Sequence, residues 1–332
     1  MRFQSLGGIN EHGRNCFLLK GGNHQLLLDC GEGQKGEYPD FSIVDVAQVD
    51  ALFLSHSHLD HTGSVKQLIS LGFKGKVYLS KETYDCMSFH NFGAVFLKPQ
   101  ENYDLYPWLK VRTYRSGHCF GSLAYLLEFV DKRIVYSGDY LEDSVFYCDS
   151  LRDIKADLAI LDGAYQNDEL DMKSNKERVL SLLKGHAKMI LPLPKNGRSM
   201  EVISLLDECG LPYQILCKDF FVENEETYLR KPVRVHPSME ANILLMDDPQ
   251  LVKMENREII QKHDSYTLVF TGTIDEGSYS EKLLKERKNT FFQRINVHQR
   301  IKDACQLASM NRFEQVILFH NEHTKEKTTL EF

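Results

Sequence analysis

The chain has 332 residues, of which 42% are hydrophobic and 26% are charged, and these values exclude a disulfide mini-scaffold, a disordered chain and a coiled coil. The chain has 40 Lys and Arg residues and 47 Asp and Glu residues, which give a formal net charge of −7. This charge argues against a protein that binds polyanions over its whole surface. No apolar run approaches the roughly 20 residues of a membrane span and the N-terminus lacks a signal-type core, so we expect no membrane segment and a cytoplasmic location.

The first half of the chain is rich in short β-type runs, and several of them end directly at polar residues. A turn at Gly21-Gly22-Asn23 separates two of these runs and indicates a hairpin. The predicted strands of this half cover residues 16–20, 25–29, 51–55, 77–80, 111–114, 124–129, 133–137 and 158–162.

Helical and buried strand patterns alternate in the second half. We predict helices at 175–184, 197–209 and 298–310, with strands or extended segments at 189–193, 213–217, 267–271 and 315–319, while 238–246 is ambiguous. The segment 195–272 is interpreted as a small α/β insertion. The fold class predicted for the whole chain is therefore α/β.

The most informative motif is the run His56-Ser-His58-Leu-Asp60-His61, directly after the predicted strand 51–55. Four potential metal ligands within six residues of a strand-to-loop turn can be aimed at one point. A polar surface loop is the alternative, but burying three imidazoles together without a ligand would be costly. Two later strands end in the same way, at His118 and Asp139, and Asp29 ends a strand of its own. The sequence therefore predicts strand ends that converge on a metal centre.

This ordered series resembles the metallo-β-lactamase fold. The stretch Leu6-Gly7-Gly8-x-x-Glu11-x-Gly13-Arg14-x-Cys16 is similar to its β-CASP nuclease branch, which includes ribonuclease J and the endonuclease of mRNA end processing. The resemblance implies a four-layered αββα sandwich, formed by a catalytic domain at 1–194 and 273–332, with a short inserted α/β cap at 195–272.

Later segments resemble further motifs of the same branch. Leu161-Asp162-Gly163-Ala164-Tyr165 resembles its acidic motif A, and the segments that contain His298 and His320 resemble its motifs B and C. Pro194-x-x-Gly197-Arg198-x-x-Glu201 resembles the entry into the cap, and Thr271-Gly272-Thr273-x-x-x-Gly277 resembles its exit.

The resemblance also implies roles for these residues. Two Zn²⁺ ions, with Mn²⁺ as an alternative, are expected to share Asp139, and a hydroxide that the two metals activate would attack phosphorus. The first ion would be held by His56, His58 and His118, and the second by Asp60, His61 and His320. Asp29 would orient a ligand imidazole from outside the ligand set.

Asp60, His298 and Asp162 are the predicted catalytic residues, with His298 as a general acid that Asp162 polarises. Asp162 could instead cap a helix N-terminus, and His323 is an alternative to His320 as the last ligand. The other histidines are expected to be structural or solvated, and they are His12, His24, His90, His186, His236 and His263.

We therefore predict a zinc-dependent phosphodiesterase that hydrolyses single-stranded nucleic acid, with RNA favoured over DNA. Lys195 and Arg198 are candidate substrate-binding residues at the entry into the cap. One alternative is a hydrolase of a thioester, a lactone or a small phosphodiester. Another is an inactive subunit that binds RNA or a partner protein. The oligomeric state is left open, with a homodimer among the options.

Overall fold

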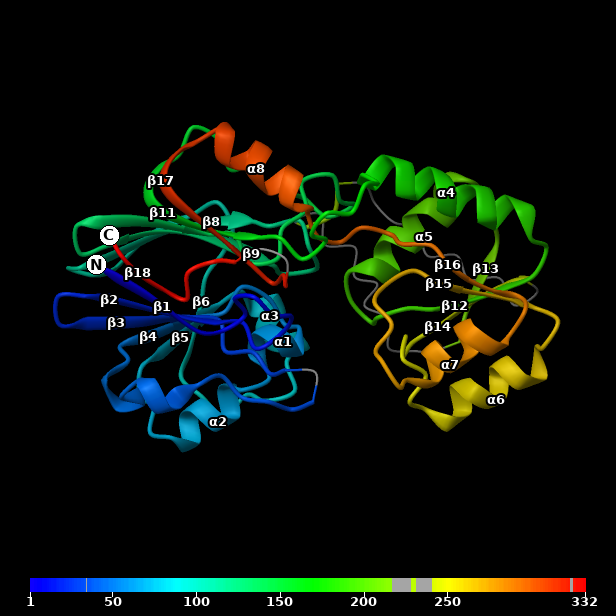
Figure 1. The fold of residues 1–332 in the computed structure, drawn as a ribbon, viewed down its shortest axis with the longest axis horizontal. Coiled ribbons are helices and arrows are strands. Elements are labelled where there is room, and N and C mark those ends of the chain that lie inside the picture. Colours follow the sequence, from blue (N-terminus) through cyan, green and yellow to red (C-terminus); the bar gives the residue numbers. More distant parts are fainter. Residues whose placement is uncertain (34, 217–227, 231–240, 323–324) are drawn as a thin grey trace. The chain divides into compact units, whose positions relative to one another are not determined.

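The structure is a computed structural model that describes residues 1–33, 35–216, 228–230, 241–322 and 325–332. Its internal contacts divide the chain into two compact units (Figure 1). Unit 1 comprises Met1–Glu142, Tyr147–Asp168 and His298–Phe332, and unit 2 comprises Asp143–Phe146 and Glu169–Val297. Unit 2 contains the predicted insertion 195–272 and extends beyond it at both ends, because strands on both sides of that segment join its sheet.

Unit 1 contains a seven-stranded sheet in the order β18-β1-β2-β3-β4-β5-β6. The strands from β3 to β6 are parallel, and the others pair antiparallel. The bounds are β1 Arg2–Gly7, β2 Cys16–Gly21, β3 His24–Leu28, β4 Ala51–Phe53, β5 Lys76–Leu79, β6 Ala94–Phe96 and β18 Thr329–Glu331. Helices α1 Leu59–Thr62, α2 Val65–Ser70 and α3 Lys81–Cys86 and the short 3-10 helices Phe41–Ile43 and Val46–Gln48 belong to the connections.

The second sheet of unit 1 has six strands in the order β17-β11-β10-β9-β8-β7. Strands β10, β11 and β17 run parallel, so their carboxyl ends meet at one edge. The bounds are β7 Asn102–Tyr106, β8 Leu109–Arg115, β9 Leu123–Phe129, β10 Lys132–Tyr136, β11 Lys155–Asp162 and β17 Arg312–Phe319, and helix α8 spans Ile301–Ser309.

The two sheets pack face to face over a core of aromatic and aliphatic side chains, including Phe17, Tyr125 and Phe319. Helix α2 packs its Val65 and Leu68 side chains against the seven-stranded sheet, and α8 covers the six-stranded sheet (Figure 1). Each sheet thus buries one face against the other sheet and the opposite face against helices. The predicted αββα sandwich is confirmed.

Unit 2 is built on a parallel five-stranded sheet in the order β13-β14-β12-β15-β16. All four residues of β12 and of β15 are buried, as is typical of parallel strands that helices cover on both faces. The strands are β12 Met189–Pro192, β13 Tyr213–Ile215, β14 Ile243–Met246, β15 Thr267–Phe270 and β16 Thr290–Phe292. The helices are α4 Met172–Gly185, α5 Arg198–Glu208, α6 Met254–Lys262 and α7 Tyr279–Glu286.

Every predicted strand and helix has a counterpart in the structure, and the ambiguous segment contributes strand β14. Strands β1, β6, β7, β16 and β18 and helices α1, α2, α3, α6 and α7 were not predicted. Among the described residues, no helix is long and apolar enough to cross a membrane.

Candidate metal centre

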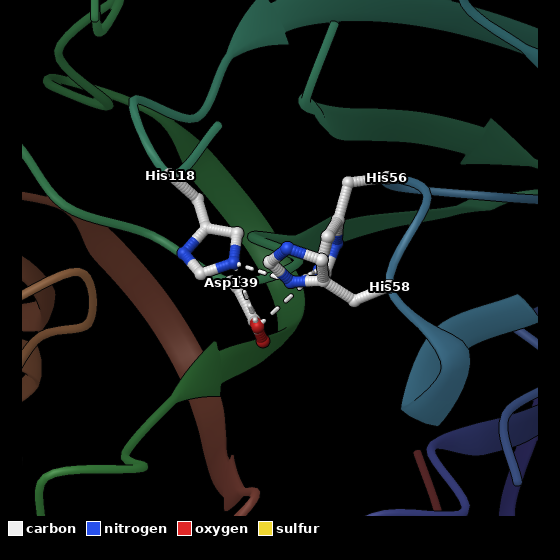
Figure 2. A group of neighbouring side chains, drawn as sticks. All are labelled: His56, His58, His118 and Asp139. Atoms are coloured by element: carbon white, nitrogen blue, oxygen red, sulfur yellow. Dashed lines mark hydrogen bonds and ion pairs between the residues drawn. The ribbon is translucent and has the colours of Figure 1, made fainter. Parts of the chain in front are cut away.

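The first group of candidate ligands comprises His56, His58, His118 and Asp139 (Figure 2). The two sheets supply its members from segments that follow strands β4, β8 and β10. The Nδ1 atom of His58 lies 3.0 Å from the Nε2 atoms of both His56 and His118. The same two Nε2 atoms each lie 3.4 Å from Oδ2 of Asp139. Four donor atoms therefore converge on one point.

These separations fit a tetrahedral zinc ion. Zn–N bonds of about 2.0–2.1 Å place neighbouring ligand atoms of a tetrahedron roughly 3.3 Å apart. Burial lowers the pKa of His56 well below its ordinary value and lowers the pKa of His58 to about 4. Both imidazoles are therefore neutral near pH 7, and their lone pairs can serve a cation.

The second group comprises Asp60, His61, Asp139 and His320. Nε2 of His61 lies 3.1 Å from Oδ1 of Asp139 and 3.6 Å from Oδ2 of Asp60, and Nε2 of His320 lies 3.3 Å from that Asp60 oxygen. Asp139 thus turns one carboxylate oxygen toward each group, as a bridging ligand would.

The histidine pKa values of this second group are shifted in the direction opposite to those of His56 and His58. Burial acts to lower the pKa of His61 and of His320, but the facing carboxylates Asp139 and Asp60 outweigh it. The pKa of His61 is raised well above its ordinary value, and that of His320 is raised to about 9. Burial also opposes ionisation of Asp139, yet the surrounding histidines hold its pKa well below the usual range.

Asp29 holds His61 from outside the ligand groups. Its Oδ2 atom accepts a 2.6 Å hydrogen bond from Nδ1 of His61, which leaves Nε2 facing the second group. The carboxylate is fixed by the backbone N–H and hydroxyl of Ser55, at 2.6 and 2.7 Å, and by the hydroxyl of Tyr136. This arrangement matches the predicted orienting role, since a ligand imidazole normally donates its other N–H to such a partner.

Sequence reasoning missed Asn15, which is fully buried in this centre. Its Nδ2 atom lies 2.9 Å from Nε2 of His61 and 3.5 Å from Oδ2 of Asp60. Its backbone N–H also donates to the carbonyl of Asp60 at 3.0 Å. The only sequence signal was its place within the N-terminal motif, directly before strand β2.

His298 lies beside both groups, and its ring centroid is 4.7 Å from that of His118 and 5.2 Å from that of His320. Its Nδ1 atom is 3.1 Å from Oδ2 of Asp162 and 3.5 Å from Oδ2 of Asp139. The Asp162 carboxylate also accepts from the backbone N–H of Ala164 at 2.9 Å. That contact closes a turn and not a helix, because the next helix, α4, begins only at Met172.

Lys195 and Arg198, the predicted substrate-binding residues, belong to unit 2. Arg198 begins helix α5, its Nε atom donates to the carbonyl of Ile295 at 3.1 Å, and its guanidinium packs against Gly272. A role of the two cations in binding substrate stays a prediction. His323, the alternative last ligand, lies outside the described residues.

Curated relatives match a large part of the chain. It is 24% identical over 251 residues to transcription termination factor FttA of Methanothermobacter thermautotrophicus, a match that covers 62% of this chain and 39% of that protein. It is 25% identical over 252 residues to endoribonuclease YSH1 of Kluyveromyces lactis, covering 63% of this chain and 33% of that protein. It is 24% identical over 245 residues to cleavage and polyadenylation specificity factor 73 of Drosophila melanogaster, covering 63% and 36%. The matches thus span only about a third to two fifths of these relatives.

The fold also matches that of a solved structure. A crystal structure of a protein of unknown function from Enterococcus faecalis superposes with a TM-score of 0.61 at 13% identity, covering 97% of this chain and 94% of that one. The family model described as the metallo-beta-lactamase superfamily matches residues 9–193, which include most of the converging ligands. The predicted resemblance is confirmed, and this chain belongs to the metallo-β-lactamase superfamily.

Proposed function

We propose that the protein is a metal-dependent phosphodiesterase that hydrolyses single-stranded nucleic acid, and RNA in particular. The observation that carries this proposal is the His298–Asp162 pair beside both ligand groups. Cleavage of a phosphodiester needs a proton for the departing oxygen, and a histidine backed by a carboxylate can supply it. The endoribonuclease named among the relatives supports the same substrate class.

The metal would be zinc, with manganese as the alternative, and two ions are proposed. His56, His58 and His118 would hold one ion, and Asp60, His61 and His320 the other, with Asp139 between them. When bound, a pair of such ions activates water as a nucleophile at neutral pH and neutralises charge on the phosphate oxygens.

Side chains around the ligands supply the remaining parts of the reaction. Nδ1 of His298 faces Asp162, so the proton that reaches the leaving oxygen would come from Nε2. Asp162 is itself fixed by the backbone N–H groups of Tyr140 and Ala164, at 3.1 and 2.9 Å. This carboxylate is therefore placed to hold the ring of His298 in one orientation, with Nδ1–H toward Asp162.

A side-by-side cleavage assay tests the proposal. Labelled single-stranded RNA, single-stranded DNA and bis-p-nitrophenyl phosphate would be incubated with the protein and zinc or manganese. Asp60→Ala serves as the metal-site variant, and Asp50→Ala, in the loop before β4, serves as the matched control. We expect RNA cleavage that is lost in Asp60→Ala and kept in Asp50→Ala.

The other outcomes would contradict the proposal in different ways. Hydrolysis of the small ester without cleavage of RNA or DNA would indicate a small-substrate hydrolase. No hydrolysis by a protein that has bound its metal would indicate an inactive binding subunit. Cleavage that survives in Asp60→Ala would remove the metal centre from the reaction.

A further inference from the structure

His12 lies at the edge of the second ligand group, in the loop between β1 and β2. Its ring centroid is 5.5 Å from that of His320, and the two rings meet at 70°. Backbone hydrogen bonds fix this loop to the ligand group: the N–H of His320 donates to the carbonyl of Gly8 at 2.8 Å, and the N–H of Asn15 donates to the carbonyl of Asp60 at 3.0 Å. The position of His12 is therefore set by the same contacts that position two of the ligands.

A second residue, Gln166, also holds the His12 ring. Nε2 of Gln166 lies 2.8 Å from Nε2 of His12. A side-chain amide nitrogen only donates, so Nε2 of His12 accepts and the ring proton resides on Nδ1. Gln166 is anchored in turn, because its carbonyl accepts from the N–H of Ile301 at 2.9 Å and its own N–H donates to Gly163 at 2.9 Å. The anchor at Ile301 is three residues from His298.

Gln166 contacts Nε2 of His12, so the other ring nitrogen, Nδ1, is the one left to contact a ligand. Within the described parts of the chain, no group accepts a hydrogen bond from its Nδ1, and the side chain is partly exposed to solvent. By contrast, the ligands His56 and His61 are completely buried. The loop thus presents a neutral, orientated N–H donor beside the candidate metal centre.

We propose that His12 contacts the substrate, donating its Nδ1–H to a phosphate oxygen next to the second ligand group. This inference rests on the proposed function. An oxygen of phosphate fits because it only accepts hydrogen bonds, whereas the edge of a base offers donors and acceptors together. The acceptor atom of His12 is already occupied by Gln166, so only a donor remains. A hydrogen bond to a charged oxygen is also roughly twice as strong as one between neutral groups.

The test compares His12→Leu, which removes the donor, with His12→Asn, whose amide nitrogen can reach close to the position of Nδ1. Steady-state cleavage of single-stranded RNA is measured for both variants and for His90→Leu, a control at an exposed histidine of unit 1. In His12→Leu we expect KM to rise about tenfold or more, as for the loss of a hydrogen bond to a charged group, with kcat within about twofold of wild type. His12→Asn should recover most of the loss, and His90→Leu should show none.

Two further readouts separate substrate contact from support of His320. Bound metal per chain, measured by elemental analysis, should be the same in wild type and His12→Leu. The Kd for labelled RNA, measured by fluorescence anisotropy after removal of metal, should rise in parallel with KM.

An unchanged KM in His12→Leu would overturn the inference, and so would a fall in kcat together with loss of metal. Either result in a protein whose wild type cleaves RNA would leave the proposed function intact. Absence of cleavage by the wild type would instead defeat the proposed function, and this inference with it.

Discussion

The two ligand groups share Asp139 but differ in their balance of charge. The first contains three imidazoles and one carboxylate, and the second contains two imidazoles and two carboxylates, with Asp29 against His61. Burial lowers the pKa of His58 in the first group to about 4. In the second group burial again acts to lower the pKa of His320, but the carboxylates raise it to about 9. The pKa values of buried histidines in one centre are therefore shifted in opposite directions, according to the carboxylates that face them.

This difference has a consequence for metal binding. In the first group the imidazoles of His56 and His58 are neutral at neutral pH, so a cation can bind to them without displacing protons. The second group holds extra protons on His61 and His320, and a cation must replace them. The groups are thus expected to differ in their response to pH and to mutation, even though they are joined by one residue.

Removal of the shared carboxylate should have the largest effect, because it damages both groups at once. For Asp139→Asn we expect loss of both ions and a fall in RNA cleavage of at least about a thousandfold. This exceeds the roughly 10-fold to 100-fold loss that is typical when a residue that only hydrogen-bonds to a metal ligand is replaced. Metal analysis and kinetics check this, with circular dichroism to show that the fold persists. Retention of one full equivalent of metal would argue against a shared ligand.

Removal of the proposed general acid should leave the two groups unaffected. His298→Ala is expected to bind the same amount of metal as wild type and to cleave RNA about 10²-fold to 10⁴-fold more slowly. Single-turnover rates and elemental analysis measure the two quantities. If the rate were unchanged, His298 would have no part in the reaction, and a loss of metal would make it a ligand.

Asp29→Asn should act on one group and spare the other. The carboxylate contacts His61 directly. Its link to the first group is indirect, through the hydroxyl of Ser55, which lies 3.0 Å from Nδ1 of His56. We expect affinity for the second ion to fall about 10-fold to 100-fold with little change for the first. Competition with a chromogenic chelator measures both affinities. Equal weakening of the two sites would refute the distinction between them.

The affinity for the second ion should also depend on pH, and the change per pH unit is expected to be smaller than the effects of the substitutions above. Below about pH 9, His320 of the metal-free protein carries a proton that a cation must displace. Because His61 also carries such a proton, affinity for the second ion should rise at least about tenfold per pH unit between roughly pH 6 and 8. His58, with its pKa of about 4, adds no such dependence to the first ion. Chelator competition at several pH values measures both slopes, and a steeper slope for the first ion would contradict the assignment.

The ligands could be predicted from the sequence because each follows a strand with a readable pattern. His56, His118 and Asp139 all lie just beyond strand ends, so local information placed them at one edge of the sheets. Asn15 and His12 could not be found in this way. Their positions depend on how the loop after β1 packs against Asp60 and His320, which lie far away in the sequence.

A similar limit explains why some elements of the fold and the contact between Tyr136 and Asp29 could not be predicted from the sequence. Tyr136 reads as an ordinary core residue of β10, and its bond to Asp29 exists only once the two sheets are packed. Strands β6, β16 and β18 were missed because each has only three residues, none of them buried, and offers little alternation to recognise. Helix α6 was missed within the insertion, where only Asn256 and Ile260 are buried and the apolar stripe is weak.

Calorimetric titration of the metal-free protein with zinc, in two buffers of different ionisation enthalpy, tests the account most directly, because it counts ions and released protons together. We predict two ions per chain, with at least one more proton released on binding the second group than on binding the first. A single ion per chain, or equal proton release for both ions, would contradict the account of two unlike groups joined by Asp139.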